Sequence, residues 1–186
     1  MSKYNSLIFS GFPGSGKSTL AKELADVYKC EVYSMGKLWR EEHKRLYPNQ
    51  EISFEEYWKN TTTEDNLNAD KKAREIFEQG HVIGDLRYSI LCRGLPTLRV
   101  FVTADLETRA KRAFDAGNYG GKSFDEIIKI LMWREKDELK KGKELYGEGY
   151  DFRDPNNYHL ILNSGVLTID QEKDIVHKAL FGKVRF

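Results

Sequence analysis

Cysteine is scarce in this sequence: 186 residues include only Cys30 and Cys92, which lie far apart. Neither belongs to a C-x-x-C pair or to a spacing typical of metal ligands, so we expect two buried free thiols and no disulfide. An excess of either charge is also missing, because 30 Lys and Arg residues stand against 29 Asp and Glu residues. This balance gives no general reason to expect nucleic acid or a membrane as a partner.

Long apolar runs are absent as well. The N-terminal segment MSKYNSLIFSGF has too short an apolar run for a secretory signal, and no stretch is long enough to cross a bilayer. The triplet that starts at Asn60 fits a glycosylation acceptor, but without a secretory signal we expect it to be unused. The sequence therefore predicts a cytoplasmic protein.

Strand-like and helix-like segments alternate along the chain. Short apolar runs predict strands at residues 6–10, 30–34, 81–85, 98–104 and 158–164. Helical patterns follow, including residues 37–47, a capping box from Ser53 to Glu56, residues 71–79 and residues 170–180. The strands at residues 81–85 and 98–104 are each followed by helix-forming sequence as well. Strands joined by helical crossovers indicate a parallel sheet with helices on both faces. With no repeat or linker, we expect one α/β domain over residues 1–186.

The segment GFPGSGKSTL, residues 11–20, joins the first predicted strand to the first helix. It fits the P-loop pattern G-x-x-x-x-G-K-S in the strand–loop–helix context that this motif requires. Its glycines let backbone N–H groups converge on phosphate oxygens at a helix N-terminus. Lys17 would bridge the β- and γ-phosphates, and the Ser18 hydroxyl would bind Mg²⁺. The predicted ATP-binding residues of this loop are Gly14, Ser15, Gly16, Lys17, Ser18 and Thr19.

A second metal ligand should stand at the end of a neighbouring strand. Asp85 follows the strand HVIG and is our candidate, the alternative being an aspartate that caps a helix or stabilises a turn.

A GTPase-like switch would need a guanine-binding N-K-x-D run, which the sequence lacks. A motor ATPase usually needs a longer chain. A phosphotransferase needs cations around the moving phosphoryl group and an acceptor pocket opposite it.

Candidates for these cations come late in the chain. Arg109 and Arg112 lie three residues apart and share one helix face after the fourth strand. The run MWREKDELKKGKELYG, residues 132–147, adds Arg134 and several lysines. Taken alone, such a run is more often a solvated helix surface. The glycine-rich residues 115–123 before it favour a mobile lid that excludes water from the reaction.

The acceptor side comes earlier in the sequence. Residues 33–42, YSMGKLWREE, leave the second strand, turn at Gly36 and bring Arg40 one helical turn further on. Arg87 follows Asp85 at the end of the third strand, and ligands bind in such sheets at the carboxyl ends of the strands. Each arginine alone could form a surface salt bridge. Together they predict a phosphorylated acceptor, because guanidinium groups bind phosphate in a bidentate way.

These motifs together resemble the cytidylate kinases, in particular their short archaeal-type branch within the nucleoside monophosphate kinases. The resemblance runs from the P-loop to LILNS and covers most of the chain. It includes YSMGKLWRE, ISFEEYWK, GHVIGDLR, VTADLETRAKR and WREKDELKKGKELYG. The last two segments are the most specific, because a generic P-loop protein requires neither.

The resemblance implies a P-loop NTPase fold with sheet order 2-3-1-4-5, an acceptor-binding segment near residues 35–80 and a small helical lid near residues 113–147. It implies Mg²⁺-dependent transfer from ATP to CMP or dCMP by a monomer that binds small-molecule nucleotides. Arg112 and Arg134 would stabilise the transferring phosphoryl group, with Lys17 as the third catalytic residue. Arg109 would lie against the ATP adenine. The implied acceptor-binding residues are Ser34, Gly36, Arg40, Asp85 and Arg87.

The sequence departs from the family pattern at several positions. Leu86 replaces a glycine, Asp85 stands where glutamate is usual, and Asn66 replaces an aspartate. Lys141 and Gly142 replace an arginine–tyrosine pair, and residues 148–157 form a longer loop.

Two alternatives remain beside the cytidylate kinase interpretation. One is a P-loop kinase of another small acceptor, such as a different nucleotide or a sugar acid. The other is a nucleotide-binding module without transfer activity.

Overall fold

The strand β1 (Ser6–Gly11) is buried along its whole length and forms the centre of a five-stranded sheet. In the computed structural model, which describes residues 3–49 and 51–182, β1 pairs with β3 (Val82–Asp85) and β4 (Thr97–Thr103). The edge strands are β2 (Glu31–Ser34) and β5 (Leu160–Asn163). All pairings are parallel and the order is β2-β3-β1-β4-β5, which confirms the predicted order.

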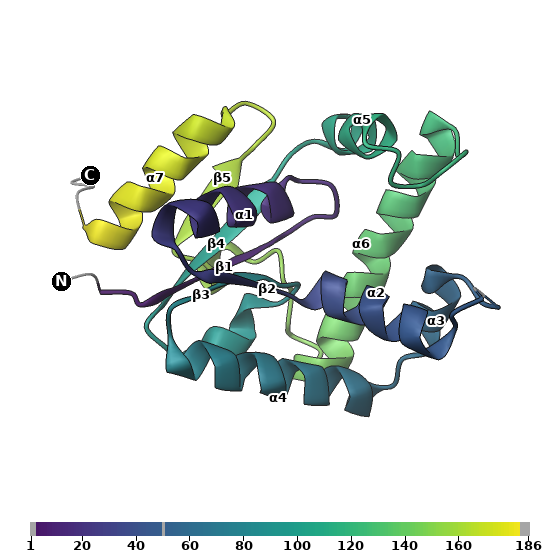
Figure 1. The fold of residues 1–186 in the computed structure, drawn as a ribbon, viewed down its shortest axis with the longest axis horizontal. Coiled ribbons are helices and arrows are strands. Elements are labelled where there is room, and N and C mark those ends of the chain that lie inside the picture. Colours follow the sequence, from purple (N-terminus) through teal and green to yellow (C-terminus); the bar gives the residue numbers. More distant parts are fainter. Residues whose placement is uncertain (1–2, 50, 183–186) are drawn as a thin grey trace.

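Helices cover both faces of this sheet, as predicted (Figure 1). Leu7 and Phe9 of β1 pack with α1 (Lys17–Tyr28) and α7 (Ile169–Phe181). Ile8 points to the opposite face and packs with α4 (Thr63–Gln79). Since successive side chains of a strand alternate between its faces, a central strand with apolar side chains on both faces has to be covered on both sides.

Loops cover part of the second face where β4 and β5 lie. There Phe101 packs against a buried aromatic cluster whose other members are Tyr88, Tyr150, Phe152 and Tyr158. Three of these side chains come from the connection between α6 and β5, which includes the 3-10 helix η2 (Pro155–Asn157). The longer loop seen in the sequence is therefore part of the hydrophobic core.

Four helices extend beyond the carboxyl ends of the strands (Figure 1). They are α2 (Met35–Leu46), α3 (Phe54–Asn60), α5 (Leu106–Asp115) and α6 (Phe124–Tyr146). Helices α5 and α6 share a small apolar cluster that includes Ala110 and Leu131. The region predicted as a lid consists of the end of α5, the glycine-containing connection and the single long helix α6.

Three local predictions need correction. The segment after β3 forms only the 3-10 helix η1 (Ser89–Cys92) instead of an α-helix, because Gly94 at φ +85° and the following Pro96 end it. Helix α4 begins well before residue 71, because Thr62 and Asp65 form a reciprocal capping box. Ser53 does cap α3 by accepting a hydrogen bond from the Glu56 N–H. The return bond from the Glu56 side chain, which would complete a capping box, is not present in the described residues.

Both cysteines are free thiols; Cys92 is buried, whereas Cys30 is partly exposed. In the described part of the chain, no helix combines the length and the apolar composition that a membrane span requires.

Candidate active site

The loop between β1 and α1 has the backbone shape that a phosphate-binding loop requires. Gly14 and Gly16 have φ angles of +79° and +90°, which residues with a side chain rarely adopt. A Cβ atom on Gly14 would also lie 3.0 Å from the Arg109 carbonyl oxygen. A cavity of about 920 Å³ is lined by Gly14, Gly16, Lys17, Ser18 and Thr19. Ser15, in the same loop, is fully buried and does not line it.

Lys17 lies at the start of α1 and is enclosed by the site. Its Nζ donates to the Phe12 carbonyl oxygen at 2.7 Å. Burial lowers the pKa of Lys17, and the nearby carboxylates of Asp85 and Glu138 act in the opposite direction. The ammonium group therefore lies at the cavity, beside the P-loop backbone and near two carboxylates.

Ser18 and Asp85, the two proposed metal ligands, are in contact. Ser18 Oγ donates to Asp85 Oδ2 at 2.5 Å, and Ser34 Oγ donates to the same oxygen at 3.3 Å. The described residues contain no group of three or more His, Cys, Asp or Glu side chains that could hold a metal. One hydroxyl and one carboxylate nevertheless fit Mg²⁺, which usually takes its other ligands from phosphates and water.

Two of the late arginines line the cavity. Arg112 donates from Nη1 to Ser164 Oγ at 2.9 Å and from Nη2 to the Ser164 carbonyl oxygen at 2.7 Å. Its Nη1 also lies 3.7 Å from the position of a Cβ on Gly16, which places it beside the P-loop. Arg134 of α6 donates to the Tyr119 hydroxyl at 3.1 Å and also lines the cavity. These two side chains can approach a phosphoryl group held by the loop.

Arg109 has a different environment. Its side chain is 4% exposed, and its guanidinium donates to the carbonyl oxygens of Ala104 and Pro13. Nη1 also forms an ion pair with Glu135 at 2.6 Å. Arg109 is not among the residues that line the cavity, so in this structure it supports the P-loop from behind. A contact with adenine stays a prediction.

Acceptor candidates also line this cavity, in a part that α2 and the residues after β3 form and that we call the acceptor end. Arg40, Gly36 and Arg87 line it, while Ser34 caps α2 and contacts Asp85 instead. The guanidinium carbon of Arg87 lies 3.9 Å from the centre of the Trp58 ring. Its Nη1 is buried and has no hydrogen-bond partner among the described residues. A buried cationic donor of this kind suits an anionic ligand.

The sequence analysis missed the aromatic lining of this end. Trp39, Trp58 and Trp133 are the three tryptophans of the chain, and all of them line the cavity together with Phe54. The rings of Trp39 and Trp58 lie 5.7 Å apart. Asp137 also lines the cavity and accepts a hydrogen bond from Trp58 Nε1 at 2.8 Å. The available signal was that all three tryptophans fall in the segments assigned to acceptor binding, residues 35–80, or to the lid, residues 113–147.

The fold and this loop define a P-loop nucleotide-binding protein. A family model described as an AAA domain matches residues 10–119, more than half of the chain. The crystal structure of shikimate kinase from Bacteroides thetaiotaomicron superposes with a TM-score of 0.60 at 17% identity, covering 94% of this chain and 97% of that one. At this identity the likeness concerns the fold alone.

Relatives with similar sequences identify the family of the chain more closely than the fold does. A cytidylate kinase of Methanopyrus kandleri is 31% identical over 188 residues, which cover 94% of this chain and 92% of the relative. A cytidylate kinase of Methanocaldococcus jannaschii is 29% identical over 94% of this chain and 96% of the relative. The chain therefore belongs to the cytidylate kinase family. This membership makes it a phosphotransferase and confirms the resemblance found in the sequence.

Proposed function

We propose that this protein transfers the γ-phosphoryl group of ATP to CMP or dCMP, giving ADP and the nucleoside diphosphate. The observation that carries the proposal is the continuity of one cavity. The P-loop with Lys17 and Ser18 lines this cavity, and so do Arg40, Arg87 and the three tryptophans. A donor phosphate and a phosphorylated aromatic acceptor can therefore face each other across it.

The residues of the chain have separate parts in this transfer. The P-loop backbone and Lys17 bind the β- and γ-phosphates, and Ser18 with Asp85 would hold Mg²⁺. When bound, the metal neutralises charge on the phosphate oxygens. Arg40 and Arg87 orient the acceptor phosphate in line with the γ-phosphorus. An acceptor oxygen then forms the new P–O bond as the bond to ADP breaks, and Arg112 and Arg134 stabilise the charge on the moving group.

The acceptor end suits a nucleotide better than a small sugar acid. Indole rings offer flat apolar surfaces for stacking, and their stacking energy depends little on which base is bound. Two arginines are suited to a phosphate dianion, which an unphosphorylated sugar acid lacks. Both features favour a nucleoside monophosphate over the alternative acceptors.

A coupled assay of ADP release tests the proposal with all nucleoside and deoxynucleoside monophosphates and with hydroxyl acceptors such as shikimate and gluconate. We expect CMP or dCMP to give the highest kcat/KM. Arg40→Ala and Arg87→Ala should each lower acceptor kcat/KM about ten- to a hundredfold, because each loses a charge-assisted hydrogen bond to phosphate. The KM for ATP should change little.

Arg45→Ala is the matched control for Arg40→Ala, because Arg45 lies on the same helix and pairs with Glu42 at the surface. Its kinetics should equal those of the unmodified protein. Faster turnover of an unphosphorylated acceptor, or unchanged acceptor kinetics in both cavity variants, would contradict the proposal.

A further inference from the structure

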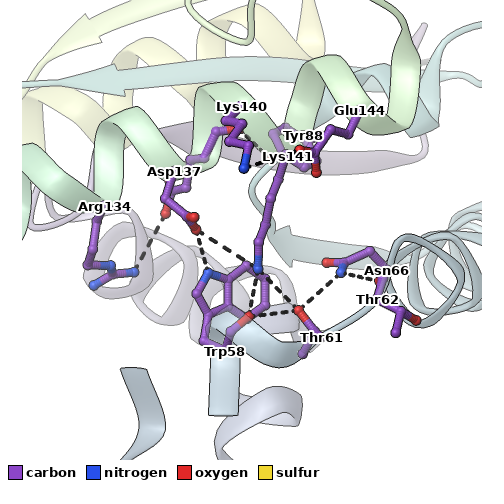
Figure 2. Close-up of polar contacts among 11 residues, drawn as sticks. Trp58, Thr61, Thr62, Asn66, Tyr88, Arg134, Asp137, Lys140, Lys141 and Glu144 are labelled. Atoms are coloured by element: carbon purple, nitrogen blue, oxygen red, sulfur yellow. Dashed lines mark hydrogen bonds and ion pairs between the residues drawn. The ribbon is translucent and has the colours of Figure 1, made fainter. Parts of the chain in front are cut away.

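Lys141 of α6 is a buried lysine that reaches across to the acceptor-binding helices (Figure 2). Its Nζ donates to the Trp58 carbonyl oxygen at 2.6 Å and to Thr61 Oγ1 at 3.1 Å. Both acceptors lie at the end of α3, where the chain turns towards α4. One side chain therefore ties the long helix α6 to the junction between α3 and α4.

The same lysine also lies over the Trp58 side chain. Its Nζ is 3.8 Å from the centre of the indole ring, and its other neighbour Asp137 accepts the indole N–H. Arg87 stacks on the same ring at 3.9 Å. Trp58 thus connects Lys141, which does not line the main cavity, to Arg87, which does.

Asn66 extends this network on the far side of Thr61, as Figure 2 shows. Its Nδ2 donates to Thr61 Oγ1 at 3.2 Å and to the Thr62 carbonyl oxygen at 2.7 Å. Asn66 is buried and does not line the main cavity. Two positions that depart from the family pattern, Asn66 and Lys141, therefore meet at one hydroxyl group.

We propose that Lys141 is a positioning residue for the acceptor: it fixes Trp58, and through Trp58 it orients Arg87 towards the acceptor phosphate. The proposal rests on the proposed function, because it takes Arg87 as a phosphate ligand. It concerns acceptor binding alone, since within the described residues Lys141 contacts Trp58, Thr61 and Asp137 and none of the P-loop residues.

The charges around Lys141 make this link sensitive to pH. The pKa of Lys141 is lowered to about 8, and burial is the largest cause; Arg87 and Lys140 act in the same direction, whereas Asp137 and Glu144 act to raise it. Asn66 and Thr61, on the side of α4 and its junction with α3, are uncharged. Above this pKa the side chain is neutral, so its bonds to the Trp58 carbonyl and its attraction to the indole ring weaken.

Three variants separate positioning from simple structural support. Lys141→Met keeps the length of the side chain without its charge, and Lys141→Arg keeps the charge. Lys140→Met is the control, because Lys140 is the adjacent residue and its side chain is 77% exposed. Each variant is checked by thermal unfolding. Binding of CMP without ATP is then measured by isothermal titration calorimetry, and KM and kcat are measured for both substrates.

We expect Lys141→Met to raise the Kd and KM for CMP about tenfold, as for the loss of one charge-assisted hydrogen bond. The KM for ATP should stay within about twofold, and Lys140→Met should match the unmodified protein, as surface substitutions usually do. Lys141→Arg should restore most of the CMP affinity. In the unmodified protein the KM for CMP should rise as the pH passes about 8, and in Lys141→Arg this rise should be absent.

Equal CMP binding by Lys141→Met and the unmodified protein would overturn the inference, as would equal weakening of CMP and ATP. If Lys141→Met does not fold, the pH profiles of Lys141→Arg and the unmodified protein decide, and parallel profiles refute the inference. Failure of the proposed function has a different signature, namely no CMP turnover by the unmodified protein itself.

Discussion

Ser18 Oγ donates a hydrogen bond to Asp85 Oδ2 at 2.5 Å, although 67 positions separate the two residues in the chain. They meet because β1 and β3 are neighbours in the sheet, with Phe9 opposite Asp85, and because α1 starts directly after the P-loop. The two proposed metal ligands are thus in contact in the protein alone. A metal that enters here has to replace one short hydrogen bond.

Asp85→Asn tests this pair. The amide is a weaker ligand for a hard cation, so the Mg²⁺ concentration for half-maximal turnover should rise at least about tenfold. Titration of activity with Mg²⁺ at fixed ATP measures the change. Asp26→Asn, on the exposed side of α1, is the control and should leave the titration unchanged. An unaltered Mg²⁺ dependence of Asp85→Asn would remove Asp85 from the metal site.

Lys17→Met tests the phosphate contact. The variant keeps the aliphatic chain but loses the cation beside the β- and γ-phosphates, so kcat should fall about 10²- to 10³-fold. Steady-state kinetics with saturating ATP and acceptor measure this loss. Lys22→Met, exposed on the same helix, serves as the control. Near-normal turnover of Lys17→Met would be incompatible with a P-loop transfer mechanism.

Arg109→Ala should act mainly on stability. The substitution removes a 4% exposed guanidinium and leaves Glu135 and the Pro13 carbonyl oxygen without their partner. Breaking a buried pair in this way costs about 3–5 kcal/mol. Urea unfolding of Arg109→Ala and of Lys111→Ala, an exposed control on the same helix, measures the difference. A normal free energy of unfolding together with a raised KM for ATP would instead support the predicted contact with adenine.

Glu172→Gln should change how stability depends on pH. Glu172 is 4% exposed, and burial raises its pKa from 4.5 to about 6, with Arg112 acting in the opposite direction. Because the folded state binds the proton more tightly, stability falls as the pH rises from about 4.5 through about 6. The glutamine variant lacks this loss. Its Tm should exceed that of the unmodified protein at pH 7 and match it near pH 4; equal pH profiles would contradict the assignment.

The strands were the most predictable part of the fold. The five apolar runs match β1 to β5 within a few residues. For the central strands β1, β3 and β4 the reason is that a strand buried on both faces leaves a continuous apolar run. The helix predicted after β3 was wrong, because Gly94 and Pro96 leave room for only the 3-10 helix η1. The start of α4 was also missed, because Thr62 is a cap only once its reciprocal bond with Asp65 forms.

The candidate active site was likewise predictable from the sequence only in part. A local motif predicted the P-loop, whose glycine conformations and lysine need only neighbouring residues. The position of Arg109 behind the loop depends on Ala104, Pro13 and Glu135, which come from three separate segments. The tryptophan lining likewise combines helices α2, α3 and α6, and no local spacing indicates that they converge.

By itself the sequence determined the α/β class, the phosphate-binding loop and the family, because each depends on periodicity or on contiguous motifs. Only the tertiary structure decided that Lys141 and Asn66 meet at Thr61 and that Arg87 lies on Trp58. The physical reason is that hydrogen bonds and cation–π contacts act over a few ångströms. Which side chains come that close is set by the packing of helices far apart in the chain.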